Sequence, residues 1–338
     1  MANKTILGID IGYDCMKLAL MSGGKLKQGI TIPMPEKMIR DGRIVSVEAL
    51  GELLRSAMKE YSIRCRDAAV VLSGESVFIR GITMPKMSAE QLEYNLPYEF
   101  RDYITDELQS YVFDYAMISK PEKAPAEETG SEPASMELLG VAAPRAMLEE
   151  MRTLVRKAGM KLTVAAPTVC AWANVIRDYE KRRIGAEYEE YCILDLGCRN
   201  TRMYMFRGDR HITTRELEVG ISNLVQVVAE VCHVDEHLAE TYLTANHENC
   251  QNSEACLNAC TGIGVELMRA FNFYQFSNPE SRLADVWLCG GGAGIAPLCQ
   301  AIDDALPVNT HPIRELLDES CAGDEDYLLA QAVGITLQ

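Results

Sequence analysis

The sequence predicts an α/β fold with mixed sheets, built as two similar halves around a cleft, and three observations support this. An apolar strand in residues 8–17 runs into Asp-Ile-Gly, turns, and resumes as a second strand that carries a basic residue. The same pattern returns half a chain later in residues 193–202. A glycine-rich loop at 290–294 then joins an apolar strand to a helix. Strands that alternate with helices in two restarting halves indicate an α/β architecture.

The elements of the first half follow from hydrophobic periodicity. Residues 6–11 and 17–21 predict a hairpin, because apolar runs flank a short turn with Gly12. Leu50, Leu54 and Met58 recur at helical spacing, and the β-branched run at 67–72 suits a buried strand. The predicted order is strands at 6–11, 17–21 and 28–33, a helix at 46–61 and a strand at 67–72.

The next stretch is more polar and predicts an inserted region. Ser88 followed by Gln91 is typical of a helix start. Between two predicted strands lies a Pro/Glu/Ala/Ser-rich segment without periodicity, for which we expect a mobile loop at 119–135. The predicted elements are a helix at 88–104, strands at 111–118 and 136–142, and helices at 144–159 and 168–180.

The second half restarts with the repeated hairpin and ends on helices. Its turn is followed by an apolar, helix-rich stretch, and the strand before the glycine loop has the continuous apolar character of a buried strand. The predicted order is a hairpin at 191–206, a strand at 210–216, helices at 221–232, 236–246 and 254–275, a strand at 285–289, and helices at 295–306 and 326–334.

Composition excludes several classes of protein. The net charge of −16 on 338 residues argues against nucleic-acid binding and against direct adsorption to anionic lipid. No apolar run reaches the ~20 residues that a membrane helix needs, and Asp10 interrupts the first apolar stretch, so we expect neither a signal peptide nor membrane insertion. Twelve cysteines without a signal peptide indicate reduced thiols and a cytoplasmic protein. Cysteines 250, 256 and 260 near His247 lack a Cys-x-x-Cys pair, which favours buried small hydrophobes over a zinc site.

The doubled turn suggests a site for phosphates and a metal ion. Successive turn amides can form a concave anion nest, and Gly12 allows close approach of the backbone. Lys17 would reach the same phosphates as a point charge. Asp10 and Asp195 would hold Mg²⁺ through water, because magnesium keeps most of its hydration shell. A single Asp-x-Gly turn is only a hairpin corner half the time, but two in register with a glycine loop indicate a nucleotide cleft.

The glycine loop and one helical pair extend the predicted site. Residues 290–294 would present a helix N-terminus to an anion, the alternative being a tight structural turn. Glu266 and Arg269 lie three apart on one predicted helix face, where they could bracket a ribose and a base edge. A solvated ion pair is the ordinary role of such residues.

These three motifs together resemble the phosphate-1, phosphate-2 and adenosine motifs of the actin/heat-shock ATPase/sugar-kinase superfamily. Within it the chain is similar to the type IV pilus assembly PilM family, relatives of the division protein FtsA. The Met-Pro-Lys-Met-Ser segment at 84–88 points to that family in particular. The resembling segments lie at 7–12 with Lys17, 84–88 with Glu99, 141–144, 158–159, 194–197 with Thr201, 218–220, 266–274, 288–292 and 332–334.

The resemblance implies a duplicated actin-like fold with an FtsA/PilM-type inserted subdomain. It implies a first half at 1–84 and 158–190, an inserted interaction subdomain at 85–157, and a second half at 191–338 whose last helix packs back on the first. It also implies ATP or ADP and Mg²⁺ in the cleft. The expected cofactor-binding residues are Asp10, Gly12, Tyr13, Asp14, Cys15, Lys17, Asp195, Gly197, Asn200, Thr201, Glu240, Glu266, Arg269, Gly290, Gly291, Gly292 and Ala293.

The family resemblance further implies a role as a scaffold. The expected partner is the short cytoplasmic N-terminal tail of a single-span membrane protein such as PilN, which would recruit the chain to the inner face of the membrane alongside other pilus components. Self-association is left open. Tyr94, Tyr98, Glu99, Arg101 and Tyr103 are candidates for the partner surface, although aromatic residues on such a helix are more often core.

Two departures from the family pattern bear on catalysis. Tyr13-Asp14 stands where PilM chains usually carry Ser-Ser, and Asp14 brings negative charge to the phosphates. Leu243 stands where FtsA-like and MreB-like chains carry a ribose lysine, so either the affinity for nucleotide is lower or the role of that lysine falls to Arg269. With no base singled out to activate water, we expect nucleotide binding with weak or no hydrolysis. The alternatives are an FtsA- or ParM-like filament-forming ATPase and, third, a small-molecule kinase.

Overall fold

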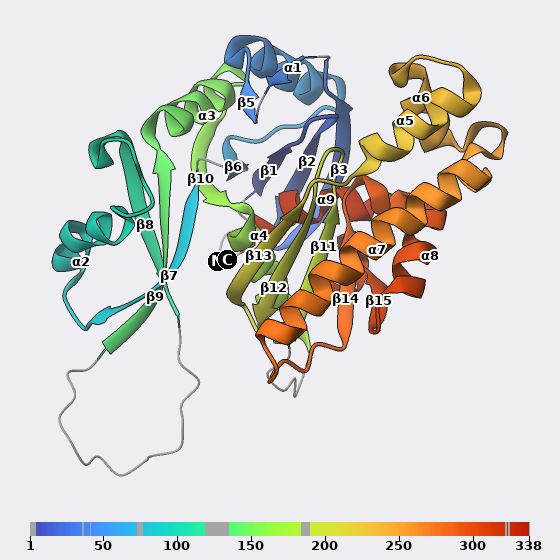
Figure 1. Ribbon diagram of the computed structural model, residues 1–338. Helices are drawn as coiled ribbons and strands as arrows, with labels where there is room; N and C mark the ends of the chain where they lie inside the picture. Colours follow the sequence, from blue (N-terminus) through green and yellow to red (C-terminus); the bar gives the residue numbers. More distant parts are fainter. Residues whose placement is uncertain are drawn as a thin grey trace. The chain divides into compact units, whose positions relative to one another are not determined.

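The computed structural model describes residues 5–35, 37–40, 42–72, 77–118, 135–183, 190–321, 323 and 325–337. The chain forms two compact units (Figure 1): unit 1 comprises residues 1–34 and 169–338, and unit 2 comprises residues 35–168. The predicted loop at 119–135 lies outside the described residues except for Ser135, which begins a strand. No helix in the described ranges is both long enough and apolar enough to cross a bilayer.

The first three strands of unit 1 form an antiparallel group that the last helix covers. They are β1 (Thr5–Ile11), β2 (Cys15–Ser22) and β3 (Lys25–Pro33). The predicted hairpin is present, and its register places Asp10 opposite Lys17. Helix α9 (Asp326–Gly334) packs on all three strands. It lies so close that a Cβ on Gly8 would come within 1.8 Å of the Ala332 carbonyl oxygen, so only glycine fits there.

A second, mixed sheet in unit 1 repeats the hairpin. Strands β11 (Glu190–Leu196), β12 (Thr201–Arg207) and β13 (Arg210–Leu217) are antiparallel. Strands β14 (Asp285–Cys289) and β15 (Asn309–Pro312) continue the sheet in parallel, in the order β13-β12-β11-β14-β15. Asp195 faces Arg202 across β11 and β12, as Asp10 faces Lys17. Both hairpins of the sequence repeat therefore pair an aspartate with a basic residue at the same position of the strand pairing.

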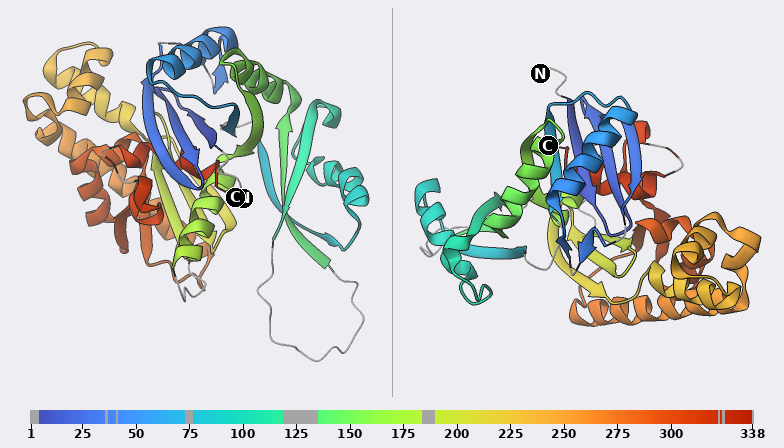
Figure 2. Two further views of the ribbon diagram at one scale, coloured as in Figure 1. Left: turned by 180° about the vertical axis from the view of Figure 1, so that it is seen from behind. Right: turned by 90° about the horizontal axis from the view of Figure 1, so that it is seen from above.

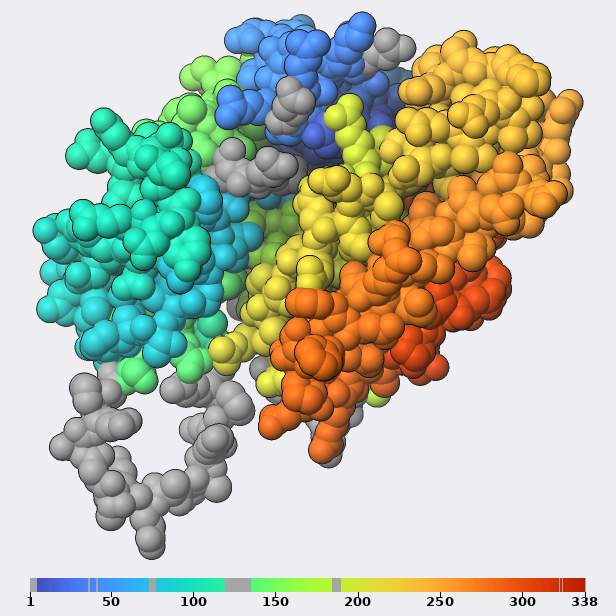
Figure 3. All heavy atoms as spheres, in the orientation of Figure 1, coloured from blue at the N-terminus to red at the C-terminus, as the bar shows by residue number. Residues whose placement is uncertain are grey.

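Helices complete unit 1, and their apolar sides bury the core of the second sheet. Cys256 and Cys260 are fully buried in this core, as expected for small hydrophobes. In Figure 3 the long helix α7 and the segment that includes α8 lie side by side, in agreement with their many contacts. The helices are α4 (Thr168–Arg182), α5 (Ile221–Cys232), α6 (Glu236–Ala245), α7 (Glu254–Ser277) and α8 (Ala296–Ala305), with 3-10 turns η3 (His247–Asn252), η4 (Gly291–Gly294), η5 (Ile313–Leu316) and η6 (Glu319–Cys321).

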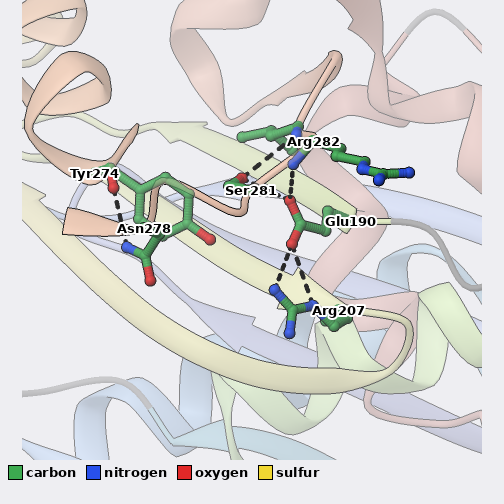
Figure 4. Close-up of polar contacts among 7 residues, drawn as sticks. Glu190, Arg207, Tyr274, Asn278, Ser281 and Arg282 are labelled. Carbon is green, nitrogen blue, oxygen red and sulfur yellow. Dashed lines mark hydrogen bonds and ion pairs between the residues drawn. The ribbon is translucent and has the colours of Figure 1, made fainter. Parts of the chain in front are cut away.

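A polar cluster fastens the start of β11 to the segment after α7 (Figure 4). The Glu190 carboxylate accepts hydrogen bonds from the Ser281 hydroxyl at 2.6 Å and the Arg282 amide at 2.9 Å, and it pairs with Arg207 at 2.7 Å. Partial burial raises the pKa of Glu190, but the Ser281 hydroxyl and the Arg207 guanidinium outweigh it and hold that pKa below its usual value.

Unit 2 begins with a two-layer part. Two short strands, β4 (Ile39–Arg40) and β5 (Arg43–Ile44), precede helix α1 (Val47–Glu60). Strand β6 (Asp67–Leu72) pairs in parallel with β10 (Lys161–Pro167), which the sequence had not predicted. Helix α1 packs closely on α3 (Arg145–Lys157), where a Cβ on Gly51 would lie 2.8 Å from the Cβ of Lys157.

The rest of unit 2 is a three-stranded antiparallel sheet with a helix on it (Figure 2). Its strands, β7 (Phe78–Pro85), β8 (Tyr111–Met117) and β9 (Ser135–Pro144), are ordered β7-β9-β8. The predicted helix at 88–104 is shorter: α2 (Ala89–Asn95) gives way to the 3-10 turn η1 (Leu96–Phe100), and η2 (Leu108–Ser110) follows. Pro97 explains the break, because it has no amide hydrogen to continue the α-helix. Phe100 and Leu138 anchor the core beneath.

Candidate functional site

The first turn of unit 1 joins β1 to β2 and carries a buried ion pair. The Gly12 amide donates to the Cys15 carbonyl at 3.0 Å, which closes the turn. Lys17 Nζ lies 3.1 Å from Asp10 Oδ2, and both side chains are largely buried. A Cβ on Gly12 would come within 2.8 Å of that Nζ. Among the hydrogen bonds of the described residues, none has the amide of Tyr13 or Asp14 as its donor, so both amides are available as donors to a ligand.

Lys17 also links the two repeats electrostatically. Burial alone would lower the pKa of Lys17, but the Asp10 and Asp195 carboxylates outweigh it and raise that pKa. The pKa of Asp195 is raised by burial and by Asp10, and is opposed by Lys17. Gln331 on α9 donates to Asp195 Oδ2 at 2.7 Å. Burial raises the pKa of the neighbouring Cys15 to about 11, so its thiol is neutral. The structure thus brings Asp10, Lys17 and Asp195 together, as the sequence predicted, and adds Gln331.

The second turn joins β11 to β12 and is held by the start of α5. The Gly197 amide donates to the Asn200 carbonyl at 3.2 Å, and the Gly197 carbonyl accepts from the Ile221 amide at 3.1 Å. Thr201 donates through its hydroxyl to the Val219 carbonyl at 2.8 Å. A Cβ on Gly220 would meet the Gly197 carbonyl oxygen at 2.7 Å. Asn200 is turned outward to Glu216. This turn is rigid at its base, whereas the amides of its tip residues have no partner among the described residues.

The tips of the two turns touch each other. The Arg199 guanidinium carbon lies 4.4 Å from the centre of the Tyr13 ring. Beside it, the Cys198 thiol donates to the Asp14 carboxylate, and burial together with this charge raises the pKa of Cys198. Burial and the Asp14 charge also raise the pKa of Glu240 on α6. Asp14, which the sequence placed toward the phosphates, is therefore engaged by Cys198 and faces a second carboxylate.

The glycine loop after β14 contacts the second turn. Gly290 has φ +79° and ψ 173°, a conformation that side chains rarely adopt. A Cβ there would come within 2.5 Å of Asp195 Oδ1 and 2.7 Å of the Leu196 carbonyl oxygen. The Gly290 amide is held by the Tyr327 carbonyl on α9 at 3.0 Å, and the Ala293 amide donates to the Gly290 carbonyl at 3.0 Å. Gly291 and Gly292 open the following 3-10 turn, whose first amides have no partner within it.

Two predicted residues do not join this cluster. Glu266 and Arg269 on α7 pair with each other on the surface, and no interaction among the described residues links them to the turns. A groove of about 720 Å³ lies on the neighbouring side of α7, between α8 and η3. None of the predicted phosphate residues lines this groove; its lining is Asn246, Gln251, Asn252, Leu257, Thr261, Val265, Met268, Ala296, Pro297, Gln300, Ala301, Asp304 and Ala305.

The arrangement in unit 1 fits a polyphosphate with a hydrated cation. Unpartnered amides at two turn tips offer donors to anionic oxygens. Glycine at 12 and 290 lets the backbone lie directly against Lys17 and Asp195, where a Cβ would clash. Asp10 and Asp195 flank a single lysine, so the pair retains negative charge for a divalent cation held through water. Among the described residues, no three His, Cys, Asp or Glu side chains form a cluster that would bind a metal directly.

In unit 2 the tyrosines singled out from the sequence are on the surface. Tyr94, Tyr98 and Tyr103 are 71%, 49% and 50% exposed, so they are not core. Their rings are ordered by neighbours: Tyr94 contacts Tyr98 at 5.8 Å between ring centres, and the Arg80 guanidinium lies 3.8 Å from the Tyr103 ring. Glu99 and Arg101 are exposed beside them. This surface is available to a partner.

Comparison with solved structures shows an actin-like fold. The chain superposes on the structure of a PilM-PilN type IV pilus biogenesis complex with a TM-score of 0.79 and 21% sequence identity, covering 98% of this chain and 97% of the other. It superposes on the ethanolamine utilization protein EutJ from Carboxydothermus hydrogenoformans with a TM-score of 0.61 and 14% sequence identity, covering 99% of this chain and 90% of the other. It superposes on MreB5 of Spiroplasma citri bound to ADP with a TM-score of 0.50 and 12% sequence identity, covering 98% of this chain and 94% of the other. No curated protein sequence matches the chain.

The sequence profile of one family matches almost the whole chain. It is described as type IV pilus assembly protein PilM and matches residues 8–322. That range takes in the turns β1–β2 and β11–β12, the three-stranded sheet of unit 2 and the glycine loop. The chain therefore belongs to the type IV pilus assembly protein PilM family.

Proposed function

We propose that this chain is a nucleotide-binding scaffold of a type IV pilus or related secretion machine. Its family membership supports the scaffold role. The observation that carries nucleotide binding is the cluster of Asp10, Lys17 and Asp195 beneath two turns whose tip amides lack partners. The ligand is ATP or ADP with Mg²⁺.

The phosphates would lie against the two turns and the glycine loop. Gly12, Gly197 and the loop at 290–293 would provide the backbone surface, and Thr201 would keep the second turn in shape through its bond to the Val219 carbonyl. Asp10 and Asp195 would hold hydrated Mg²⁺, which supplies positive charge to the phosphates when bound. Glu240, Glu266 and Arg269 are proposed for the adenosine end.

Slow or absent hydrolysis is part of the proposal. A base that activates water must be free to accept a proton at the right place. Asp10 is paired with Lys17, Asp195 accepts from Gln331, and Asp14 accepts from Cys198. Each of these carboxylates already has a partner, which favours a nucleotide that is held rather than turned over.

The proposed protein partner is the N-terminal cytoplasmic tail of a single-span membrane protein of the PilN kind. A solved PilM-PilN complex shares the fold of this chain. Binding such a tail would place this protein at the inner face of the membrane through its partner. The exposed tyrosines of unit 2 are proposed as part of the surface that meets pilus components.

Titration calorimetry with MgATP tests the nucleotide proposal. We expect micromolar or tighter binding and negligible phosphate release. Asp195→Ala should abolish binding and preserve the circular dichroism spectrum, because it removes a carboxylate from the end of a strand and no core volume. Asp304→Ala, which removes an exposed carboxylate on α8, is the matched control and should bind as the wild type does. Absence of binding by the wild-type protein, or rapid turnover, would contradict the proposal.

A peptide titration tests the partner proposal separately. The probe is a synthetic peptide with the N-terminal residues of the PilN-like protein encoded by the same organism. We expect saturable binding to the wild-type protein and weaker binding to Tyr98→Ala. Phe276→Ala removes an even more exposed aromatic ring, 87% exposed on α7 in unit 1, and should leave peptide affinity unchanged. If the peptide does not bind, the scaffold proposal loses its partner whatever the result with nucleotide.

A further inference from the structure

One contact in unit 1 joins the tips of the two turns, and the two Asp-x-Gly motifs do not account for it. Tyr13 follows Gly12 at the tip of the first turn, and Arg199 lies at the tip of the second, two residues after Gly197. The Arg199 guanidinium carbon is 4.4 Å from the Tyr13 ring centre, well within cation–π distance. We call this pair the clasp. Both residues belong to the turns whose tip amides have no partner among the described residues.

The charges beneath the clasp show why Arg199 matters. Lys17, the cation that the motif assigns to phosphates, is buried against Asp10 at 3.1 Å and is also stabilised by Asp195. Its charge is already balanced by two carboxylates. Asp14 and Glu240 add further negative charge nearby. A polyphosphate would bring Mg²⁺ into this space, but none of these side chains offers it a cation that is free of a carboxylate partner.

Arg199 is such a cation. It is exposed, and none of the ion pairs recorded for the described residues includes it, in contrast to Arg202 three residues later, which pairs with Glu216 at 2.7 Å. Its partner is the neutral face of an aromatic ring. A guanidinium binds phosphate oxygens through two parallel charge-assisted hydrogen bonds, which are stronger than a contact with an exposed ring.

We propose that the clasp is a phosphate gate: Arg199 rests on the Tyr13 ring and leaves it to bind the phosphates of an incoming nucleotide. The inference rests on the nucleotide site proposed above and assigns its regulation to two residues. Arg199 is the phosphate-binding partner, and Tyr13 competes with phosphate for it. The departure from the usual family residues at Tyr13 then has a purpose, because a serine there could not hold the guanidinium.

If the clasp is a gate, substitutions of its two residues should change MgATP affinity in opposite directions. Arg199→Ala removes charge-assisted hydrogen bonds and should weaken MgATP binding by about tenfold or more. Tyr13→Leu frees Arg199 and should strengthen MgATP binding by about two- to fivefold, which is the cation–π contact that no longer has to be broken. A contact that merely stabilised the turns would weaken binding in both variants.

Calorimetric titration of MgATP into the full-length variants measures this. Arg215→Ala is the matched control, because Arg215 also lies over an aromatic ring, 4.1 Å from the centre of Phe273, and its loss changes the net charge equally. It should bind MgATP as the wild type does. Thermal melts establish that each variant is folded. If Arg199→Ala binds as tightly as the control, or if Tyr13→Leu binds more weakly than the wild type, the gate is overturned while the nucleotide site stands.

A spectroscopic readout follows the gate itself. In Tyr13→Trp the indole replaces the ring under Arg199, and its fluorescence should change when MgATP removes the guanidinium. The same probe in an Arg199→Ala background should not respond. An equal response in both backgrounds would show that Arg199 does not move and would reject the gate. If wild-type protein binds no MgATP at all, the nucleotide site and the gate fail together, which is a result distinct from either pattern above.

Discussion

Replacing Gly290 with alanine should break the link between the glycine loop and the second turn. The residue has φ +79° and ψ 173°, a region that is almost restricted to glycine and costs a side chain about 1–3 kcal/mol. The added Cβ would also lie 2.7 Å from the Leu196 carbonyl oxygen and 2.5 Å from Asp195 Oδ1. The first of these is backbone of a central strand and cannot turn aside.

The magnitude follows from adding the two effects. Conformational strain and a forced shift of β11 against the loop together predict a loss of about 2–4 kcal/mol in the free energy of unfolding. Asp195 would be displaced as well, so MgATP affinity should fall even where the protein remains folded. Urea unfolding followed by circular dichroism measures the first quantity, and calorimetry measures the second.

Gly291→Ala is the control within the same loop. Its φ is not in the left-handed region, and the added Cβ would meet only the Cδ1 end of the Ile221 side chain at 2.8 Å, which can rotate away. We expect a loss below about 1 kcal/mol. Equal stabilities of the two variants would refute the argument from backbone geometry.

Three further predictions concern other contacts of unit 1. Glu190→Gln should destabilise the protein by about 1–2 kcal/mol at neutral pH. Because the pKa of Glu190 is lower in the folded protein, this loss of stability should disappear as pH falls from the unfolded pKa of ~4.3 through the folded pKa. Urea titrations at several pH values measure it. Gln331→Leu removes the hydrogen bond that lowers the pKa of Asp195, so MgATP affinity should fall severalfold, and more steeply in mildly acidic buffer. Gly8→Ala should unfold unit 1 in thermal melts, because its Cβ would overlap the Ala332 carbonyl, whereas Gly29→Ala meets only a Leu329 methyl group and should lower the melting temperature less.

Much of the fold could be predicted because its strands and helices are locally encoded. The strands that lead into the two Asp-x-Gly turns are nearly continuous apolar runs, and several helices begin at a capping side chain, such as Ser88 with Gln91 on α2. Among the described residues, five strands were missed. β4 and β5 have two residues each and β15 has four, and β7 and β10 are mixed runs whose strand character comes from pairing with β9 and β6. Such pairing is a long-range property that local patterns do not report.

The sequence indicated the residues of each turn, but not the contacts between residues that are distant in the sequence. Asp10 and Lys17 face each other because hairpin register follows from the short turn. The contact of Tyr13 with Arg199 joins residues far apart in sequence, and only the folded structure shows it. Gln331 also went unpredicted, since one amide on a terminal helix has no motif around it. Glu266 and Arg269 form the surface ion pair that is the ordinary role of such a spacing, and their place at the adenosine end stays a prediction.

The packing of α9 on the first three strands has a consequence for biosynthesis. Unit 1 is discontinuous: its opening 34 residues are completed by the segment from 169 onward, and the helix that covers β1 is synthesised long after β3. At a synthesis rate of about 5–20 residues per second, the interval between β3 and α9 is roughly 15–60 seconds. Unit 2 is continuous and can fold during that wait. Throughout this interval the nascent chain carries an uncovered hairpin, which makes those apolar strands natural clients of a chaperone at the tunnel exit.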